Sequence, residues 1–288
     1  MPPLPPLPLA AAILISLGYV LLLYVPPFRS SLPRDHPSTI TRRTAACLVS
    51  CALAPLPLLW LSSSGGRPLL LLGLAPPHPL RALLAPPALA LLPYLPGLLF
   101  SGRAPSLPLR SRAALFRDLL VAPLAEEWCY RACLLPLLLL LRPLSSPAAA
   151  VWTAPLFFSL AHAHHHFAGV VNAESASRAS TAALVLLIQL AYTYVFGAFA
   201  AHMLLATGSF WGVAAAHALC NLLGLPSVGC ADGTKDKGGR GAARRIRHGL
   251  AIASTVLATG GMVAGVVAAR QGSDRGVGGG LLLLASAG

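Results

Sequence analysis

Residues 121–133 read VAPLAEEWCYRAC, an apolar run that holds two adjacent carboxylates and one arginine. The chain has only eight acidic residues, and two of them stand here, where the surrounding Leu and Ala predict a membrane helix. An ionisable group at membrane depth is unfavourable, so it usually faces a bundle interior or a water-filled cavity and has a function. We therefore expect this stretch to lie at the centre of both the fold and the site.

Helix geometry separates the three charges of this stretch. Glu127 and Arg131 are four residues apart and share a helix face, so they are expected to form an ion pair. Glu126 lies roughly 100° round the helix and has no basic residue within helical reach. A carboxylate without a basic partner suits the role of a general base. A purely structural Glu–Arg clamp between helices explains the same residues equally well at this point.

The composition predicts an all-α protein, a polytopic membrane helical bundle of about eight transmembrane helices. The 288 residues are 56% hydrophobic and 10% charged, whereas a soluble domain carries about 25% charged residues. A spanning chain rich in Leu and Ala must satisfy its backbone within helices. The formal charge of +13 lies mainly in loops between apolar runs, where cations set topology and meet anionic headgroups. We therefore expect the lipid bilayer as a partner and no nucleic acid.

The predicted spans lie near 8–25, 44–61, 83–100, 122–141, 148–165, 181–205, 208–226 and 249–269. Two further stretches are apolar but do not read as spans. Residues 68–77 are too short to cross and are predicted to be interfacial or re-entrant. Residues 108–119 mix apolar and basic positions, as in a helix lying on the membrane surface.

The loop charges predict the orientation. With a lumenal N-terminus, fifteen of the 21 Lys and Arg residues fall in cytosolic loops 26–43, 101–118, 166–180 and 227–248, and five fall on the lumenal side. This split follows the positive-inside rule. It also places Glu126 near the cytosolic end of its helix, on the same side as two histidines of other spans. We therefore expect a site open to the cytosol.

Two i,i+4 pairs supply the further polar groups. Phe158 and His162 share one helix face, and His217 and Asn221 share another. A glutamate and a histidine can hold and deprotonate a water, while a second histidine and an amide can stabilise the oxyanion of a tetrahedral intermediate. This set suffices for amide hydrolysis without a covalent intermediate. No G-x-S-x-G or H-E-x-x-H motif occurs, so a serine hydrolase or an ordinary zincin is not supported.

Taken in order, these motifs resemble a known family. Glu126-Glu127-x-x-x-Arg131, Phe158-x-x-x-His162 and His217-x-x-x-Asn221 match the three motifs of the type II CAAX prenyl endopeptidases, within the wider CPBP or ABI group of intramembrane proteases. The flanks PLAEEWCYRACLLPLL, FFSLAHAHHH and HALCNLLGLP are similar too, and the resemblance covers roughly residues 80–226.

The resemblance implies a multi-pass enzyme of the endoplasmic reticulum membrane that removes the C-terminal tripeptide from prenylated CAAX proteins. By motif, Glu126 and His162 would activate the water, and His217 and Asn221 would form the oxyanion site. Glu127 and Arg131 would support the site, and Phe158 would shape the pocket. The substrate partners would be prenylated CAAX proteins; the oligomeric state is not predicted.

The domain organisation follows from these assignments. It consists of an N-terminal transmembrane region (1–80), the catalytic membrane core (81–226), a basic cytosolic loop (227–248) and a C-terminal transmembrane helix with its tail (249–288). The six cysteines form no CxxC pair and are interpreted as buried thiols rather than disulfide or metal sites.

Three alternatives stay open at this point. In the first, Glu126, His162 and His217 ligate zinc, with residues 164–166 as extra donors, although Asn221 is a poor zinc ligand and metal-free catalysis is favoured. In the second, the chain is a non-catalytic membrane scaffold or protein-binding module. In the third, a transporter uses the charged helix as a proton relay.

Overall fold

A computed structural model of the protein describes residues 7–61, 72–95, 110–141 and 146–224, and within these ranges all regular secondary structure is helical. The predicted all-α class is confirmed. Large apolar side chains such as Leu14, Leu160 and Leu187 point outward with well over half of their surface exposed. Such helix faces suit contact with lipid rather than water. The fold is a helical membrane bundle.

The helices follow the chain as a series of long and short segments. They are α1 (Leu7–Leu21), the 3₁₀ turn η1 (Leu22–Tyr24), α2 (Pro37–Leu53), α3 (Leu56–Leu61), α5 (Pro79–Ala90), the 3₁₀ turn η2 (Leu92–Tyr94), α7 (Arg112–Phe116), the π-helical η3 (Arg117–Val121), α8 (Ala122–Glu127), the π-helical η4 (Trp128–Leu134), α9 (Leu135–Leu139), α10 (Pro147–His162), α11 (His164–Val171), α12 (Ala176–Thr207) and α13 (Phe210–Leu223).

Three helical runs among the described residues are long and apolar enough to cross a membrane. They are Leu7–Tyr24, Pro37–Leu61 and Ala176–Thr207. The helix Phe210–Leu223 is apolar but shorter. The predicted span at 249–269 and the predicted loop at 227–248 lie outside the described residues.

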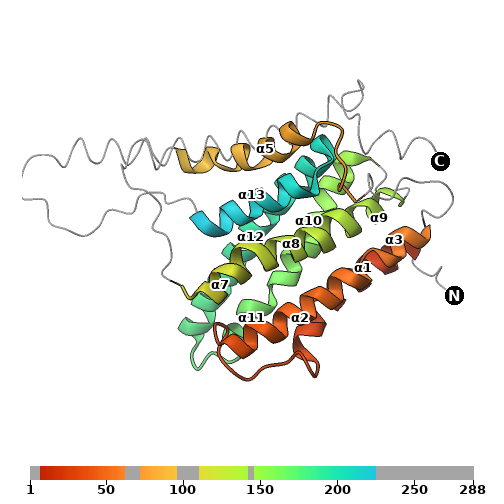
Figure 1. The fold of residues 1–288 in the computed structure, drawn as a ribbon. Helices are drawn as coiled ribbons and strands as arrows, with labels where there is room; N and C mark the ends of the chain where they lie inside the picture. The colour runs from red at the N-terminus through yellow and green to blue at the C-terminus, as the bar shows by residue number, and fades with distance from the viewer. Residues whose placement is uncertain (1–6, 62–71, 96–109, 142–145, 225–288) are drawn as a thin grey trace, which may run out of the picture.

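One continuous helical run, from Arg112 to Leu139, forms the centre of the bundle. In Figure 1, α8 lies between α13 on one side and α1 and α2 on the other, with α5 beyond α13. The run passes through two π-helical turns, and each is followed closely by a proline, Pro123 or Pro136. A proline has no N–H to donate within the helix, and π turns accompany such interruptions, often at functional sites. The prolines thus modulate this helix without ending it.

The beginning of this run corrects two sequence predictions. The carboxylate helix starts at Arg112 rather than near 122, because the hydroxyl of Ser111 accepts a hydrogen bond from the backbone N–H of Ala114 and caps it. The described part of 108–119 is therefore the first turns of the carboxylate helix, not a separate surface helix. The described part of 68–77 forms a turn, and the carbonyl of Gly73 accepts a hydrogen bond from the N–H of Phe210, so this turn docks on the start of α13. Its interfacial or re-entrant placement stays a prediction.

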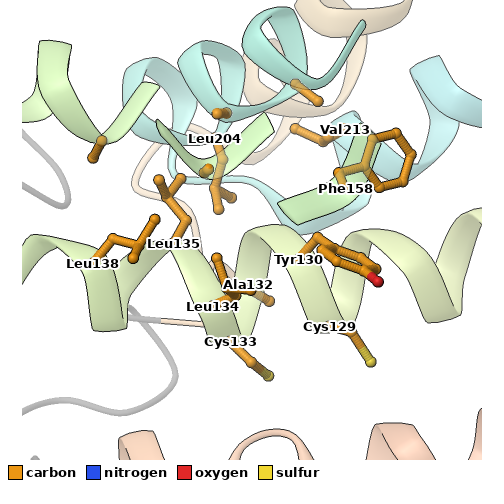
Figure 2. Close-up of a cluster of buried hydrophobic side chains, with 14 of the residues drawn as sticks. Cys129, Tyr130, Ala132, Cys133, Leu134, Leu135, Leu138, Phe158, Leu204 and Val213 are labelled. Atoms are coloured by element: carbon orange, nitrogen blue, oxygen red, sulfur yellow. The ribbon is translucent and has the colours of Figure 1, made fainter. Parts of the chain in front are cut away.

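The core surrounds η4 and α9. Leu134, Leu135, Leu137 and Leu138 have no exposed surface, and neighbouring residues of η4 are buried on every side. Figure 2 shows Leu135 pointing toward Leu204 of a neighbouring helix and Val213 lying beside Phe158, while Cys129 and Cys133 point to the opposite side. A helix that is apolar all round is a buried one. The carboxylate helix is thus held from all directions, which fixes its polar groups in space.

Glycines set two close contacts beside this core. A Cβ at Gly212 would lie 2.1 Å from the carbonyl oxygen of Ala82, so α13 and α5 approach more closely than any other residue allows. Gly208 ends α12 with a φ of 65°, a left-handed conformation that glycine adopts without strain. Gly208 thus ends one helix, and Gly212 allows a close contact between two others.

Candidate active site

Glu127 is the buried anchor of the site. Its side chain has no exposed surface, and its Oε1 accepts hydrogen bonds from Arg131 Nη1 at 3.1 Å and His217 Nδ1 at 2.7 Å. The ion pair that the i,i+4 spacing predicted is confirmed. The link to His217 comes from a helix 90 residues further along the chain, so it ties α13 to the carboxylate helix.

The guanidinium of Arg131 is held by aromatic rings as well as by Glu127. Its central carbon lies 3.9 Å from the ring centroid of Phe158 and 5.7 Å from that of Phe196. Glu127 Oε2 and Arg131 Nη2 have no hydrogen-bond partner among the described residues. A desolvated cation over an aromatic face gains about 2 kcal/mol, which partly offsets the burial of this charge.

Glu126 faces two histidines from two other helices. Its Oε2 lies 3.7 Å from His162 Nε2 and 3.8 Å from His217 Nε2. These distances are too long for direct hydrogen bonds and leave room for a bridging group. The sequence placed no basic residue within helical reach of Glu126, and its partners indeed come from across the bundle.

Hydrogen bonds at the far side of each ring fix which nitrogen faces Glu126. His162 Nδ1 lies 2.8 Å from the carbonyl oxygen of Phe158, and a carbonyl can only accept, so this nitrogen carries the proton. His217 Nδ1 likewise donates to the Glu127 carboxylate. When the His162 ring carries a single proton, that proton is on Nδ1 and Nε2 is the hydrogen-bond acceptor. A water between that acceptor and the Glu126 carboxylate can donate one hydrogen to each.

Phe158 packs among the charged groups of the site. It is almost fully buried, and its ring centroid lies 4.4 Å from that of His162 and 6.2 Å from that of His217. Figure 2 shows its ring next to Tyr130, with the centroids 5.3 Å apart. It therefore orients both histidines and Arg131.

Asn221 lies apart from this cluster. Its side chain is exposed, and its Nδ2 donates to the carbonyl oxygen of Asp118 at 2.9 Å. The bond uses one of the two amide hydrogens and attaches the end of α13 to η3. The structure thus brings together Glu126, Glu127, His162 and His217, with Asn221 one helical turn beyond His217.

A cavity of about 90 Å³ opens in front of Glu126 and His162. Such a volume holds several water molecules. Tyr19 from α1 and Cys47 from α2 line it as well, and the Tyr19 hydroxyl lies 3.5 Å from Cys47 Sγ. The water-holding pair therefore stands at the wall of a space that a reactant can enter.

Three arginines line the same cavity. They are Arg34, Arg43 and Arg117. Arg117 is buried and pairs with Asp35 at 2.8 Å and with Asp118 at 2.7 Å. Burial alone would raise the pKa of Asp118, but hydrogen bonds from Arg117 and from Arg110 outweigh it and hold that pKa below its usual range. Asp118 is thus a fixed negative charge beside these three arginines, which we call the basic rim of the cavity.

The three histidines at residues 164–166, the extra donors of the zinc alternative, begin α11. His164 lines the cavity, its Nδ1 lies 2.5 Å from the carbonyl of Ala161, and its ring packs against Tyr24 with centroids 5.9 Å apart. No group of three or more His, Cys, Asp or Glu side chains in the described ranges is arranged to hold a metal ion. The five cysteines within those ranges are free.

Sequence reasoning missed the contribution of the N-terminal helices. Tyr19, Arg34, Arg43 and Cys47 lie outside the stretch that carries the motifs, yet they line the cavity. One signal was present in the sequence. Arg43 and Cys47 are four residues apart in α2, so they share one face.

Comparison with known proteins finds a match to the same part of the chain that carries the site. A family model described as type II CAAX prenyl endopeptidase Rce1-like matches residues 108–223. The matched range contains the glutamates, Arg131, both site histidines, Phe158 and Asn221.

Individual relatives extend the match toward the N-terminal helices. CAAX prenyl protease 2 of Homo sapiens is 35% identical over 238 residues, covering 74% of this chain and 69% of that protein. The protein of the same name from Rattus norvegicus is 32% identical over 235 residues, covering 74% of this chain and 67% of that protein. CAAX prenyl protease 2 of Arabidopsis thaliana is 37% identical over 117 residues, covering 40% and 36%. No solved structure matches the chain.

Proposed function

The chain belongs to the type II CAAX prenyl endopeptidase family, and from this premise we propose that it removes the C-terminal tripeptide of prenylated CAAX proteins by direct attack of an activated water. One observation carries the mechanism. Glu126 Oε2 and the acceptor nitrogen of His162 stand 3.7 Å apart at the wall of a cavity, a separation that suits one shared water. The family names supply the substrate class.

In the proposed first step, the water donates one hydrogen to Glu126 and one to His162. Its oxygen attacks the carbonyl carbon of the scissile amide while Glu126 takes the proton, and a tetrahedral oxyanion forms. In the second step, protonated Glu126 returns that proton to the leaving nitrogen as the carbon–nitrogen bond breaks. The second hydrogen of the water passes from the new carboxyl group to the amine, so the products are the prenylcysteine carboxylate and the free tripeptide with a protonated amino group, and the glutamate ends in its starting form.

We propose His217 and Asn221 as the donors to the oxyanion. The charges of Glu126, Glu127 and Arg131 sum to −1, so one proton on His217 makes the buried cluster neutral and turns its Nε2 into a donor. The hydrogen bond from His217 Nδ1 to Glu127 aims this nitrogen toward Glu126. Asn221 keeps one amide hydrogen beyond the one given to Asp118. Preorganised donors of this kind are strong because they need no rearrangement during the reaction.

We further propose an endoplasmic reticulum membrane location with the site open to the cytosol. The cavity is lined by the end of α10, the first turns of α2 and the residues just before α8. The first turns of α2 and the residues before α8 adjoin the basic loops 26–43 and 101–118, and the end of α10 precedes the loop 166–180; the positive-inside rule assigns all three loops to the cytosol. A prenylated protein would then keep its lipid in the bilayer while its peptide enters the cavity.

Catalysis is proposed to need no metal. The support is the donor set itself, since the Glu126–His162 pair suffices to bind and deprotonate water and Glu127 is already occupied by Arg131 and His217. In the zinc alternative, the side-chain nitrogen atoms of His162 and His217 would instead ligate the metal. That mechanism predicts that a chelator stops cleavage, whereas the metal-free mechanism predicts that it does not.

The test is cleavage of a farnesylated CAAX peptide by membranes that contain the chain, with and without a zinc chelator. We expect tripeptide release that the chelator does not reduce. Release that stops with chelator and returns with added zinc would keep the substrate and replace the mechanism. No release from membranes shown to contain the inserted protein would favour the scaffold or transporter alternatives.

A further inference from the structure

The basic rim of the cavity has more positive charge than its own acids neutralise. Asp118 forms ion pairs with Arg117 and Arg110 and lies 3.9 Å from Arg34. Asp35 pairs with Arg117. These acids therefore face an excess of guanidinium groups. Arg43 stands out among them, because it lines the cavity and has neither an ion pair nor a hydrogen bond with any residue in the described ranges. Such an excess of guanidinium groups suits the binding of an anion.

We propose that Arg43, with Arg34 and Arg117 beside it, binds the free α-carboxylate at the C-terminus of the substrate. Binding of the substrate C-terminus at the rim would then determine which peptide bond of the substrate lies at the catalytic residues. This inference rests on the proposed function, since it assigns the recognition of the substrate end to the cavity whose other wall performs the cleavage.

The dimensions of the site agree with a tripeptide. Arg117 and Glu126 are nine residues apart on one helical run, a rise of about 13 Å. Three extended residues span at most about 10 Å, and a guanidinium–carboxylate hydrogen bond adds about 2.8 Å. A carboxylate held at the rim thus places the third peptide bond from the chain end near Glu126.

Arg43 also has the right position on its helix. It lies one turn before Cys47, and both residues line the cavity. Arg43 is half-buried, whereas the side chain of Arg34 is 58% exposed. A partly desolvated guanidinium binds a carboxylate through two parallel hydrogen bonds, which makes Arg43 the main contact and Arg34 a supporting one.

The test combines two farnesylated peptides with variants of the full chain in membranes. The peptides share one sequence and end in a free carboxylate or in a carboxamide. The variants are Arg43→Gln, Arg43→Lys and the control Arg42→Gln. Arg42 is the preceding residue of the same helix but is exposed, and it donates to the carbonyls of Pro27 and Arg29 outside the cavity.

We expect the carboxamide to lower kcat/KM of the unaltered enzyme by about 10–100-fold, the range of a lost charge-assisted hydrogen bond. Arg43→Gln should lower kcat/KM for the carboxylate peptide by a similar factor and change cleavage of the carboxamide peptide less than about threefold. Arg43→Lys should restore part of the loss, and Arg42→Gln should cleave both peptides like the unaltered enzyme.

Equal losses on both peptides in Arg43→Gln would overturn the inference, because they indicate a structural role. Equal cleavage of the two peptides by the unaltered enzyme would overturn it as well. If Arg43→Gln does not insert or fold, Arg34→Gln at the exposed part of the rim provides the same comparison with a smaller expected loss. Failure of the unaltered chain to cleave either peptide would refute the proposed function itself, a result distinct from the loss of selectivity between them.

Discussion

Exchanging Glu127 for glutamine separates the structural glutamate from the reactive one. Glu127→Gln keeps the size of the side chain but removes the charge that faces Arg131 and His217 in a site without exposed surface. The matched control is Glu126→Gln, the same substitution at the preceding residue, whose carboxylate makes no direct hydrogen bond at 3.7 and 3.8 Å from its neighbours.

The expected loss of stability follows from these contacts. Glu127 accepts two charge-assisted hydrogen bonds, each of which contributes about 1.5–3 kcal/mol. Breaking a buried ion pair by removing one partner costs about 3–5 kcal/mol, since the other charge stays buried. The contact of Arg131 with Phe158 is present before and after the change, so it does not enter the difference. A loss of about 3–5 kcal/mol lowers Tm by on the order of 10 °C in a chain of this size.

Thermal unfolding of the purified variants in detergent measures this difference. Glu127→Gln should melt on the order of 10 °C below the unaltered protein, whereas Glu126→Gln should melt within a few degrees of it. The reasoning is refuted if Glu127→Gln keeps its Tm and loses only activity. In that case the roles of the two glutamates would have to be exchanged.

The other predictions concern the water, the oxyanion and the helix contact. His162→Ala should lower tripeptide release by about 10²–10⁴-fold, the range for a lost acid–base partner, in protein that still inserts; near-normal turnover would remove it from the mechanism. Asn221→Ala should reduce the rate by about 10²–10³-fold if its remaining amide hydrogen reaches the oxyanion, and an unchanged kcat would show that its bond to η3 is its whole role. Gly212→Ala should destabilise the protein by about 1–3 kcal/mol, because the new Cβ meets the Ala82 carbonyl at 2.1 Å, whereas Gly18→Ala, with nothing within 4 Å, should not lower Tm; equal melting of the two glycine variants would contradict the close packing of α13 on α5.

The sequence predicted those parts of the site that helix periodicity determines. Glu127 and Arg131 pair as their i,i+4 spacing indicated, and Phe158 and His162 share one face for the same reason. The apolar composition likewise predicted a helical membrane bundle, since spacing and hydropathy are local properties of the chain.

Contacts between helices were beyond such reasoning. The bond from His217 to Glu127 depends on how α13 packs against α8, and no local pattern specifies which of two adjacent glutamates a distant histidine meets. The same holds for Arg43, which reaches the cavity only because α2 lies beside α8. The early start of the carboxylate helix was missed because basic residues lower the hydropathy of its first turns, although its Ser111 cap supports helix there.

The central claim is that the Glu126 carboxylate activates the attacking water. Its most direct test is single-turnover cleavage of a farnesylated CAAX peptide by purified Glu126→Gln protein whose folding and peptide binding match those of the unaltered protein. The account predicts that tripeptide release slows by at least about 10²-fold while binding of the peptide is unchanged, because glutamine cannot accept the proton of the water. Release within a few-fold of the normal rate would contradict the account and would leave Glu126 as a structural group.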